Sequence, residues 1–201
     1  MSVDLYWLPL GAGGHSVRFN GLVFEAIAAR LERRTRRALY HSALEVTVDG
    51  ERWIIEMAPV WNERTAERGV VGEGAVGSRR LGRARLFRYE VRCWRDGRIP
   101  DRAEAVDSPQ RLTEDPLIAR RVLALTADVP RPVWGRDELR AGEMWSCNSV
   151  TAWLIARSGI DPGLARVPAG GRAPGWTAGL ARPIVEVPRA SVSYPCPLEV
   201  P

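Results

Sequence analysis

The stretch that decides the fold runs from residue 40 to residue 60 and reads YHSALEVTVDGERWIIEMAPV. Two runs rich in apolar and β-branched residues, 38–48 and 52–58, flank the dipeptide Asp49-Gly50. An Asp-Gly pair between two such runs is typical of a tight turn joining two antiparallel strands. The stretch therefore predicts a β-hairpin, and with it an antiparallel β-sheet.

Further strands are predicted on either side of this hairpin. Residues 4–10 form a short apolar run. Residues 85–94, RLFRYEVRCW, alternate between apolar side chains on one side and charged ones on the other. Strict alternation is typical of a half-buried strand. The region in between, 62–82, is rich in Gly, Arg and Glu, and we expect it to be an exposed excursion.

Helices are predicted at 21–37, at about 116–126 and at 147–158, each from apolar residues at helical spacing. Asp115-Pro116 suits the start of the second, because an acidic cap followed by Pro at the first helical position favours a helix N-terminus. Ser146 and Gly159 bracket the third as its predicted cap and stop. The fold class expected is α+β, with the antiparallel sheet packed against the helix that begins at Cys147.

The length of 201 residues suits one domain, which we place at 1–159. Residues 160–201 are rich in Pro and Gly, so we expect no regular element there. This segment is predicted to be a tail that wraps the domain. The sequence does not determine the oligomeric state.

The positive charge is dispersed along the chain. The formal charge is +5 and the isoelectric point about 9.7. All 29 basic residues are Arg, and they are interleaved with 24 acidic residues. Because a nucleic-acid-binding protein concentrates its basic side chains on one face, nucleic acid is an unlikely partner.

Cysteine and histidine usage argues against metal and disulfide chemistry. The 3 cysteines lack a C-x-x-C spacing and the chain has only 2 histidines, so we expect neither a metal site nor a disulfide framework. No motif points to a cofactor, and none is expected. We also expect no signal peptide and no transmembrane segment, which together predict a cytoplasmic protein with free thiols.

Cys147 is the candidate nucleophile. It stands at the start of a predicted helix, where unpaired backbone N–H groups and the helix dipole favour a thiolate. The same N–H groups could stabilise the oxyanion that forms when a carbonyl is attacked. The alternative is a buried structural cysteine, and the position of Cys147 alone does not decide between them. We expect Cys93 to be an inert buried side chain and Cys196 to be incidental.

Candidate partners for Cys147 lie on the hairpin. His41 begins the first strand and has the proton affinity needed of a general base. Glu56 is surrounded by apolar residues on the second strand, where a carboxylate could orient the imidazole of His41. The alternatives are a hydrogen-bonded histidine without a catalytic role and a structural or edge-strand carboxylate. His15, in a Gly-rich loop, is the rival base.

These residues carry a resemblance to a known group of enzymes. The segment YHSALEVTVDGERWIIEMAPV, followed by WSCNSVTAWLIARSGI, resembles the circularly permuted papain-like cysteine enzymes of the lecithin–retinol acyltransferase type. It is also similar to the permuted peptidases that act on ubiquitin-like modifiers. His41 matches the histidine that begins a strand, Glu56 a second polar residue, and Cys147 the nucleophile, with Asn148 after it. The acyltransferase type has His where this chain has Glu56, and residues 60–140 match no part of the pattern.

The resemblance implies a cysteine hydrolase that works through an acyl-enzyme on Cys147, with His41 as base. We expect an amide or peptide substrate, as for a thiol protease, with Trp145 and Asn148 lining the substrate site. Ester and thioester substrates stay open, as does a thiol acyltransferase or lipid esterase. The alternative from another class is a catalytically inactive protein-interaction module on the same fold.

Overall fold

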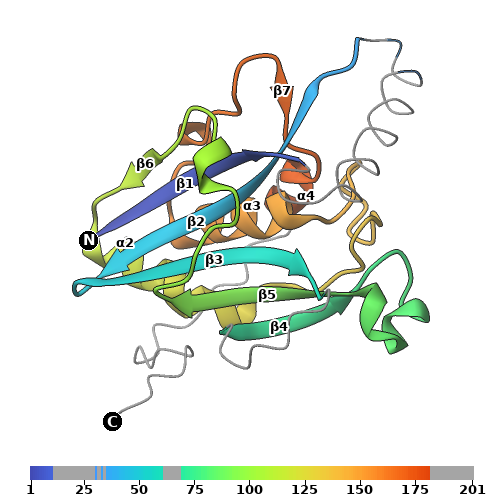
Figure 1. The fold of residues 1–201 in the computed structure, drawn as a ribbon, viewed down its shortest axis with the longest axis horizontal. Coiled ribbons are helices and arrows are strands. Elements are labelled where there is room, and N and C mark those ends of the chain that lie inside the picture. The colour runs from blue at the N-terminus through green and yellow to red at the C-terminus, as the bar shows by residue number, and fades with distance from the viewer. Residues whose placement is uncertain (11–29, 31–32, 34, 61–68, 182–201) are drawn as a thin grey trace.

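The computed structural model describes residues 1–10, 30, 33, 35–60 and 69–181 (Figure 1). The helix predicted at 21–37 falls largely outside the described residues. His15 and Cys196 lie outside them altogether, as does the part of the predicted tail from residue 182 onward.

One antiparallel sheet runs through the molecule in the order β4-β5-β3-β2-β1-β6, and β7 pairs in parallel with the start of β2. Each strand pairs with its neighbours along this path as Figure 1 shows. The strands are β1 (Ser2–Pro9), β2 (Ala38–Val48), β3 (Glu51–Pro59), β4 (Val70–Ala75), β5 (Arg88–Arg95), β6 (Gln110–Thr113) and β7 (Gly171–Arg172).

The predicted hairpin is confirmed as β2 and β3, with the turn at Asp49-Gly50. Both turn residues have positive φ, 52° at Asp49 and 81° at Gly50, which is the conformation that an Asp-Gly turn supplies. The turn fixes the register of β2 against β3. Because side chains alternate along a strand, that register also fixes which residues of each strand face the helices.

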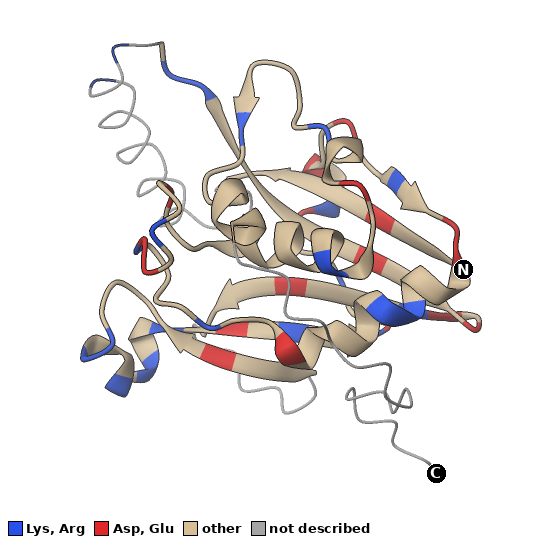
Figure 2. Cartoon of the chain, turned by 180° about the vertical axis from the view of Figure 1, so that it is seen from behind, with Lys and Arg blue, Asp and Glu red and all other residues tan. Residues whose placement is uncertain are grey.

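The helices α2 (Pro116–Leu125), α3 (Cys147–Ser158) and α4 (Trp176–Leu180) lie together on one face of the sheet (Figure 2). We call this the helix face and the opposite one the far face. Side chains of the helix face form one large apolar core with α2 and α3. Buried members of that core from the strands are Val3, Leu5, Trp7, Tyr40, Leu44, Val46, Val48, Trp53, Ile55, Met57, Tyr89, Val91, Cys93 and Leu112. A much smaller apolar cluster lies on the far face around Leu8, Ala43 and Ile54.

Both predicted helix starts are confirmed. The Asp115 carboxylate accepts hydrogen bonds from the backbone N–H groups of Leu117 and Ile118, and Pro116 is the first residue of α2. Ser146 caps α3 in a capping box with Ser149. Gly159 ends α3 in the left-handed conformation, with φ of 93°. These caps satisfy backbone groups that a helix end otherwise leaves without partners.

Two expectations about irregular regions are wrong. The predicted excursion 62–82 contains β4, which pairs with β5. The segment after residue 159 is not without regular elements, since β7 and α4 both lie in it. Composition concealed β4 because it contains Gly72 and Gly74, and glycine is depleted in strands. A Cβ atom at Gly74 would come within 2.4 Å of the Tyr89 ring, so close packing requires glycine there.

The expected fold class is confirmed at the level of an α+β protein whose antiparallel sheet packs against the helix that begins at Cys147. Among the described residues, none of the helices is long and apolar enough to cross a membrane.

Candidate functional site

The start of α3 holds Cys147 in a closed, hydrogen-bonded environment. Cys147 is 7% exposed. Its sulfur interacts with the backbone N–H groups of Ser42, Asn148 and Cys147 itself and with the Ser146 side chain, all of which lower the pKa of the thiol. Burial outweighs these groups and raises the pKa of Cys147 to about 11. The thiol is therefore protonated at neutral pH, contrary to the thiolate expected from a helix N-terminus.

The Asn148 side chain forms three hydrogen bonds, two of which link α3 to β2 of the sheet. Its Oδ1 accepts from the Ser42 hydroxyl at 2.9 Å. Its Nδ2 donates to the carbonyl oxygens of Tyr40 at 2.9 Å and Pro174 at 3.0 Å. Asn148 is 2% exposed and Ser42 is 1% exposed. The amide is thus engaged within the protein, and the expected substrate-binding role of Asn148 has no geometric support.

Residues 174 and 175, later in the chain, also bind the start of α3. We call the hydrogen-bonded contact of Ser42, Ser146, Asn148 and Ser149 with these two residues the joint. The Pro174 carbonyl accepts a second hydrogen bond, from the Ser146 hydroxyl at 2.7 Å, and the Gly175 carbonyl accepts one from the Ser149 hydroxyl at 2.6 Å. Gly175 has φ of 86°, and a Cβ atom there would lie 2.3 Å from the Ser146 oxygen. Only glycine fits this position without moving the cap of α3.

The structure does not bring His41 to Cys147. His41 is paired with Leu8 of β1, and Leu8 belongs to the far-face cluster. Directly paired residues of antiparallel strands share a face, so the imidazole of His41 points to the far face. The next residue, Ser42, points to the helix face, where its hydroxyl contacts α3. Cys147 and His41 therefore lie on opposite sides of the sheet.

The His41 imidazole is kept neutral by its surroundings. Desolvation by burial lowers the pKa of His41 to about 4, although the residue as a whole is only partly buried. A neutral imidazole on one face and a protonated thiol on the other cannot exchange a proton in this arrangement.

Glu56 shares the far face with His41 but forms an ion pair with Arg92. Its Oε1 accepts from the Arg92 guanidinium at 3.2 Å, and the same guanidinium donates to Glu90 at 3.0 Å. All three side chains are buried, with exposed fractions of 7% for Glu56, 3% for Glu90 and 5% for Arg92. We call these three residues the buried ion cluster. Glu56 thus takes the structural role that was the alternative to orienting His41.

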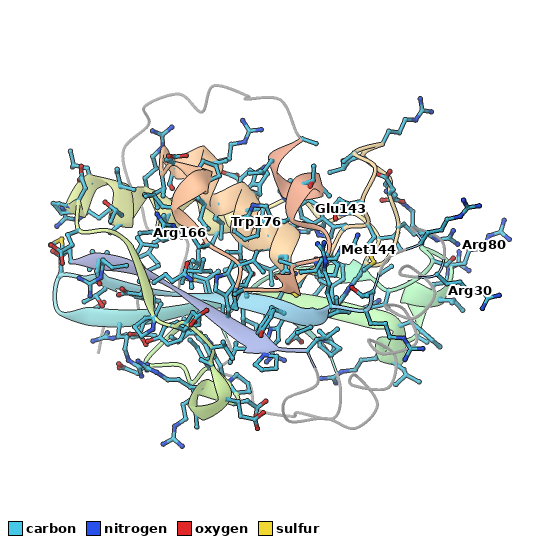
Figure 3. All side chains as sticks on the ribbon, turned by 90° about the horizontal axis from the view of Figure 1, so that it is seen from above. Arg30, Arg80, Glu143, Met144, Arg166 and Trp176 are labelled. Carbon is cyan, nitrogen blue, oxygen red and sulfur yellow. The ribbon has the colours of Figure 1, made fainter. Side chains whose placement is uncertain are left out.

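Trp145 does not wall a groove. Its side chain is 1% exposed and belongs to the core under the helices. Its backbone is also committed, because the N–H donates to Arg136 and the carbonyl accepts from Gly135, both at 2.9 Å. The other tryptophan near this joint, Trp176, packs against Trp7 with ring centroids 5.3 Å apart. Figure 3 shows Trp176 on the helix side of the sheet.

Sequence reasoning missed Ser42 as the partner of α3. The signal was present, because Ser42 is in phase with the apolar residues Tyr40, Leu44, Val46 and Val48. His41 is in phase with Ala43 and Glu45 instead. In the same way, the alternation in 85–94 places Glu90 and Arg92 opposite the core side, where Glu56 also lies.

A search of the described residues finds no group of His, Cys, Asp and Glu side chains that could hold a metal ion. Cys93 is 1% exposed and belongs to the large apolar core, as expected of a buried core side chain. No protein-family model, curated protein or solved structure matches this chain.

Proposed function

We propose that the chain is a non-catalytic binding module on a fold of the permuted papain-like kind. The observation that carries this proposal is that Ser42, rather than a base, is the residue of β2 that contacts the start of α3. Its hydroxyl donates a hydrogen bond to Asn148, and its N–H interacts with the Cys147 sulfur. A thiol hydrolase needs a general base beside the sulfur of its nucleophilic cysteine.

The order of elements supports the fold part of the proposal. A strand that carries His41 leads through a tight turn to a second strand with a buried polar residue, and the helix that begins with Cys147 comes later and packs on the same sheet. The chemistry of Cys147 supports the non-catalytic part. With a pKa of about 11, only about one thiol in ten thousand is ionised at pH 7.

Alkylation of Cys147 tests the proposal. Iodoacetamide should modify Cys147 slowly at pH 7, with a rate that rises only above about pH 9, and His41→Ala should leave the rate unchanged. Cys93→Ala and Cys196→Ala variants keep the mass-spectrometric readout specific to Cys147. Rapid labelling of Cys147 at pH 7 that slows tenfold or more in His41→Ala would overturn the proposal.

The second candidate function is the cysteine hydrolase expected from the sequence, acting on an amide bond. The observation that favours it is that Cys147 is the first residue of α3, with backbone N–H groups directed at its sulfur. The same labelling experiment separates the two functions. A hydrolase should also trap an acyl group on Cys147 when it is offered an activated ester, and Cys147→Ser should abolish that adduct.

A further inference from the structure

Positive charge is dispersed along most of the chain but is concentrated in the segment 78–88, SRRLGRARLFR. It contains five arginines, Arg79, Arg80, Arg83, Arg85 and Arg88, and no acidic residue. It connects β4 to β5 through two short turns of 3-10 helix, 81–83 and 85–87. We call it the Arg-rich connection.

Two of these arginines pair with acidic neighbours. Glu138 pairs with Arg79 at 3.0 Å, and Glu73 pairs with Arg88 at 3.1 Å. Arg80, Arg83 and Arg85 are exposed. Exposed guanidinium groups are therefore concentrated on this segment.

Large apolar side chains stand among the arginines and face solvent. Leu86 is 62% exposed, Leu81 47% and Phe87 37%. Of the eight large apolar residues exposed in the described part of the chain, these three fall within seven consecutive positions. Exposed apolar residues gathered in this way mark an interaction site more often than scattered ones do.

The connection lies at one end of the molecule. Figure 1 shows it beyond the ends of β4 and β5, and Figure 2 shows several blue patches along its ribbon and no red one. In Figure 3 the side chains of Arg80 and Arg30 extend from the same end, although they come from distant parts of the sequence. Arg30 is exposed too.

We propose that the Arg-rich connection docks the protein on an anionic phospholipid surface. Guanidinium groups bind phosphate in a two-pronged geometry and are attracted to anionic headgroups. Leu81, Leu86 and Phe87 can enter the boundary between headgroups and acyl chains, as the apolar side of an interfacial segment does. Nucleic acid would use the arginines but would leave the two leucines without a role. The joint at the start of α3 contributes no residue to this site, so the docking proposal is independent of the proposed function.

Co-sedimentation with lipid vesicles tests the proposal. The full chain should bind vesicles of phosphatidylglycerol and phosphatidylcholine, and should not bind vesicles of phosphatidylcholine alone. The triple variant Arg80→Gln/Arg83→Gln/Arg85→Gln should bind the anionic vesicles about a hundredfold more weakly, from the contribution of each basic residue near such a surface. Leu86→Ser should weaken binding about fivefold, since it removes an inserting side chain.

Matched controls keep the result specific to the connection. Arg98→Gln/Arg121→Gln/Arg166→Gln removes the same charge from exposed positions elsewhere, and Leu117→Ser alters a leucine that is 73% exposed on α2. Both controls should bind like the unaltered protein. Absence of binding to anionic vesicles, or equal losses in the two triple variants, would overturn the proposal. So would a Leu86→Ser variant that binds vesicles normally while a single-stranded oligonucleotide competes with them.

Discussion

The two faces of the sheet handle polar groups in opposite ways. On the helix face the core is apolar, and its polar side chains gather at one joint where Ser42 and Asn148 meet through neutral hydrogen bonds. On the far face, charged side chains pair across neighbouring strands. Asp4 pairs with Arg111 there, and Glu45 with both Arg52 and Arg102. The buried ion cluster is the most enclosed of these groups.

This difference explains why the expected catalytic residues do not come together. The expected nucleophile belongs to the helix face, whereas the expected base and its orienting carboxylate belong to the far face. A sheet separates them, and a one-residue change of phase along β2 is all that distinguishes Ser42 from His41. Substitutions on each face measure how strongly that face depends on its polar groups.

The largest effect is expected in the buried ion cluster. Arg92→Leu leaves two buried carboxylates without their guanidinium, which should lower the free energy of unfolding by about 4 kcal/mol. Urea unfolding followed by circular dichroism measures it. The control is Arg88→Leu, on the same strand but paired with Glu73 near the surface, where the two side chains are 42% and 47% exposed. It should cost less than about 1 kcal/mol. Equal costs would mean that burial of the cluster has no energetic consequence.

The neutral joint on the helix face should come second. Asn148→Ala removes three side-chain hydrogen bonds and should cost about 3 kcal/mol in unfolding free energy. Ser42→Ala removes one of them and should cost about 1 kcal/mol. The same unfolding measurement applies to both. If the two variants were equally stable, Asn148 would not be the link between α3 and the sheet.

His41 should make the far face sensitive to acid. Its pKa is about 4 in the folded protein against 6.5 for an ordinary histidine, so between these values the unfolded chain binds a proton that the folded chain does not. Stability should therefore fall as the pH drops from about 6.5 to 4, by about 2 kcal/mol for this partly exposed residue. Over the same pH range, the His41→Gln variant should lose about 2 kcal/mol less unfolding free energy than the unaltered protein. Identical pH profiles would show that the imidazole is solvated.

The last effect, at the opposite end of the pH range, is expected at Cys147. Its pKa is about 11 in the folded protein and 9.0 in the ordinary thiol, so the unfolded chain releases its proton first as the pH rises. Stability should fall between about pH 9 and pH 11, by about 2 kcal/mol at the upper end of that range. Cys147→Ala should lack this loss. A stability that rises with pH in the unaltered protein, relative to Cys147→Ala, would mean that the thiolate is the favoured form.

The sequence predicted those parts of the fold that depend on neighbouring residues. The Asp49-Gly50 turn and the caps Asp115, Ser146 and Gly159 each act within a few positions, and all are where the sequence indicated. The assignment of the site depended instead on which side of a strand each residue faces. Its error came from pairing His41 with Cys147 by residue type and order, without testing the phase of His41 against Leu44 and Val46.

Other misses have a tertiary cause. α4 begins after Gly175, whose backbone conformation is set by the cap of α3 rather than by its own neighbours. β4 depends in the same way on the Tyr89 ring that covers Gly74. The Ser42–Asn148 bond joins residues separated by 106 positions. The alternation along β2 indicates which face Ser42 occupies, but no local pattern identifies Asn148 as its partner.

The joint at Asn148 has a consequence for how the chain is made. Synthesis proceeds from the N-terminus, and β2, β3 and α3 have all left the ribosome before Pro174 and Gly175 do. Until those two residues arrive, Ser146, Asn148 and Ser149 lack the carbonyl acceptors that complete the start of α3. A chain that ends just after Gly159 should therefore be cleaved by proteases faster than the unaltered protein, and residues 160–181 belong to the same folding unit as α3.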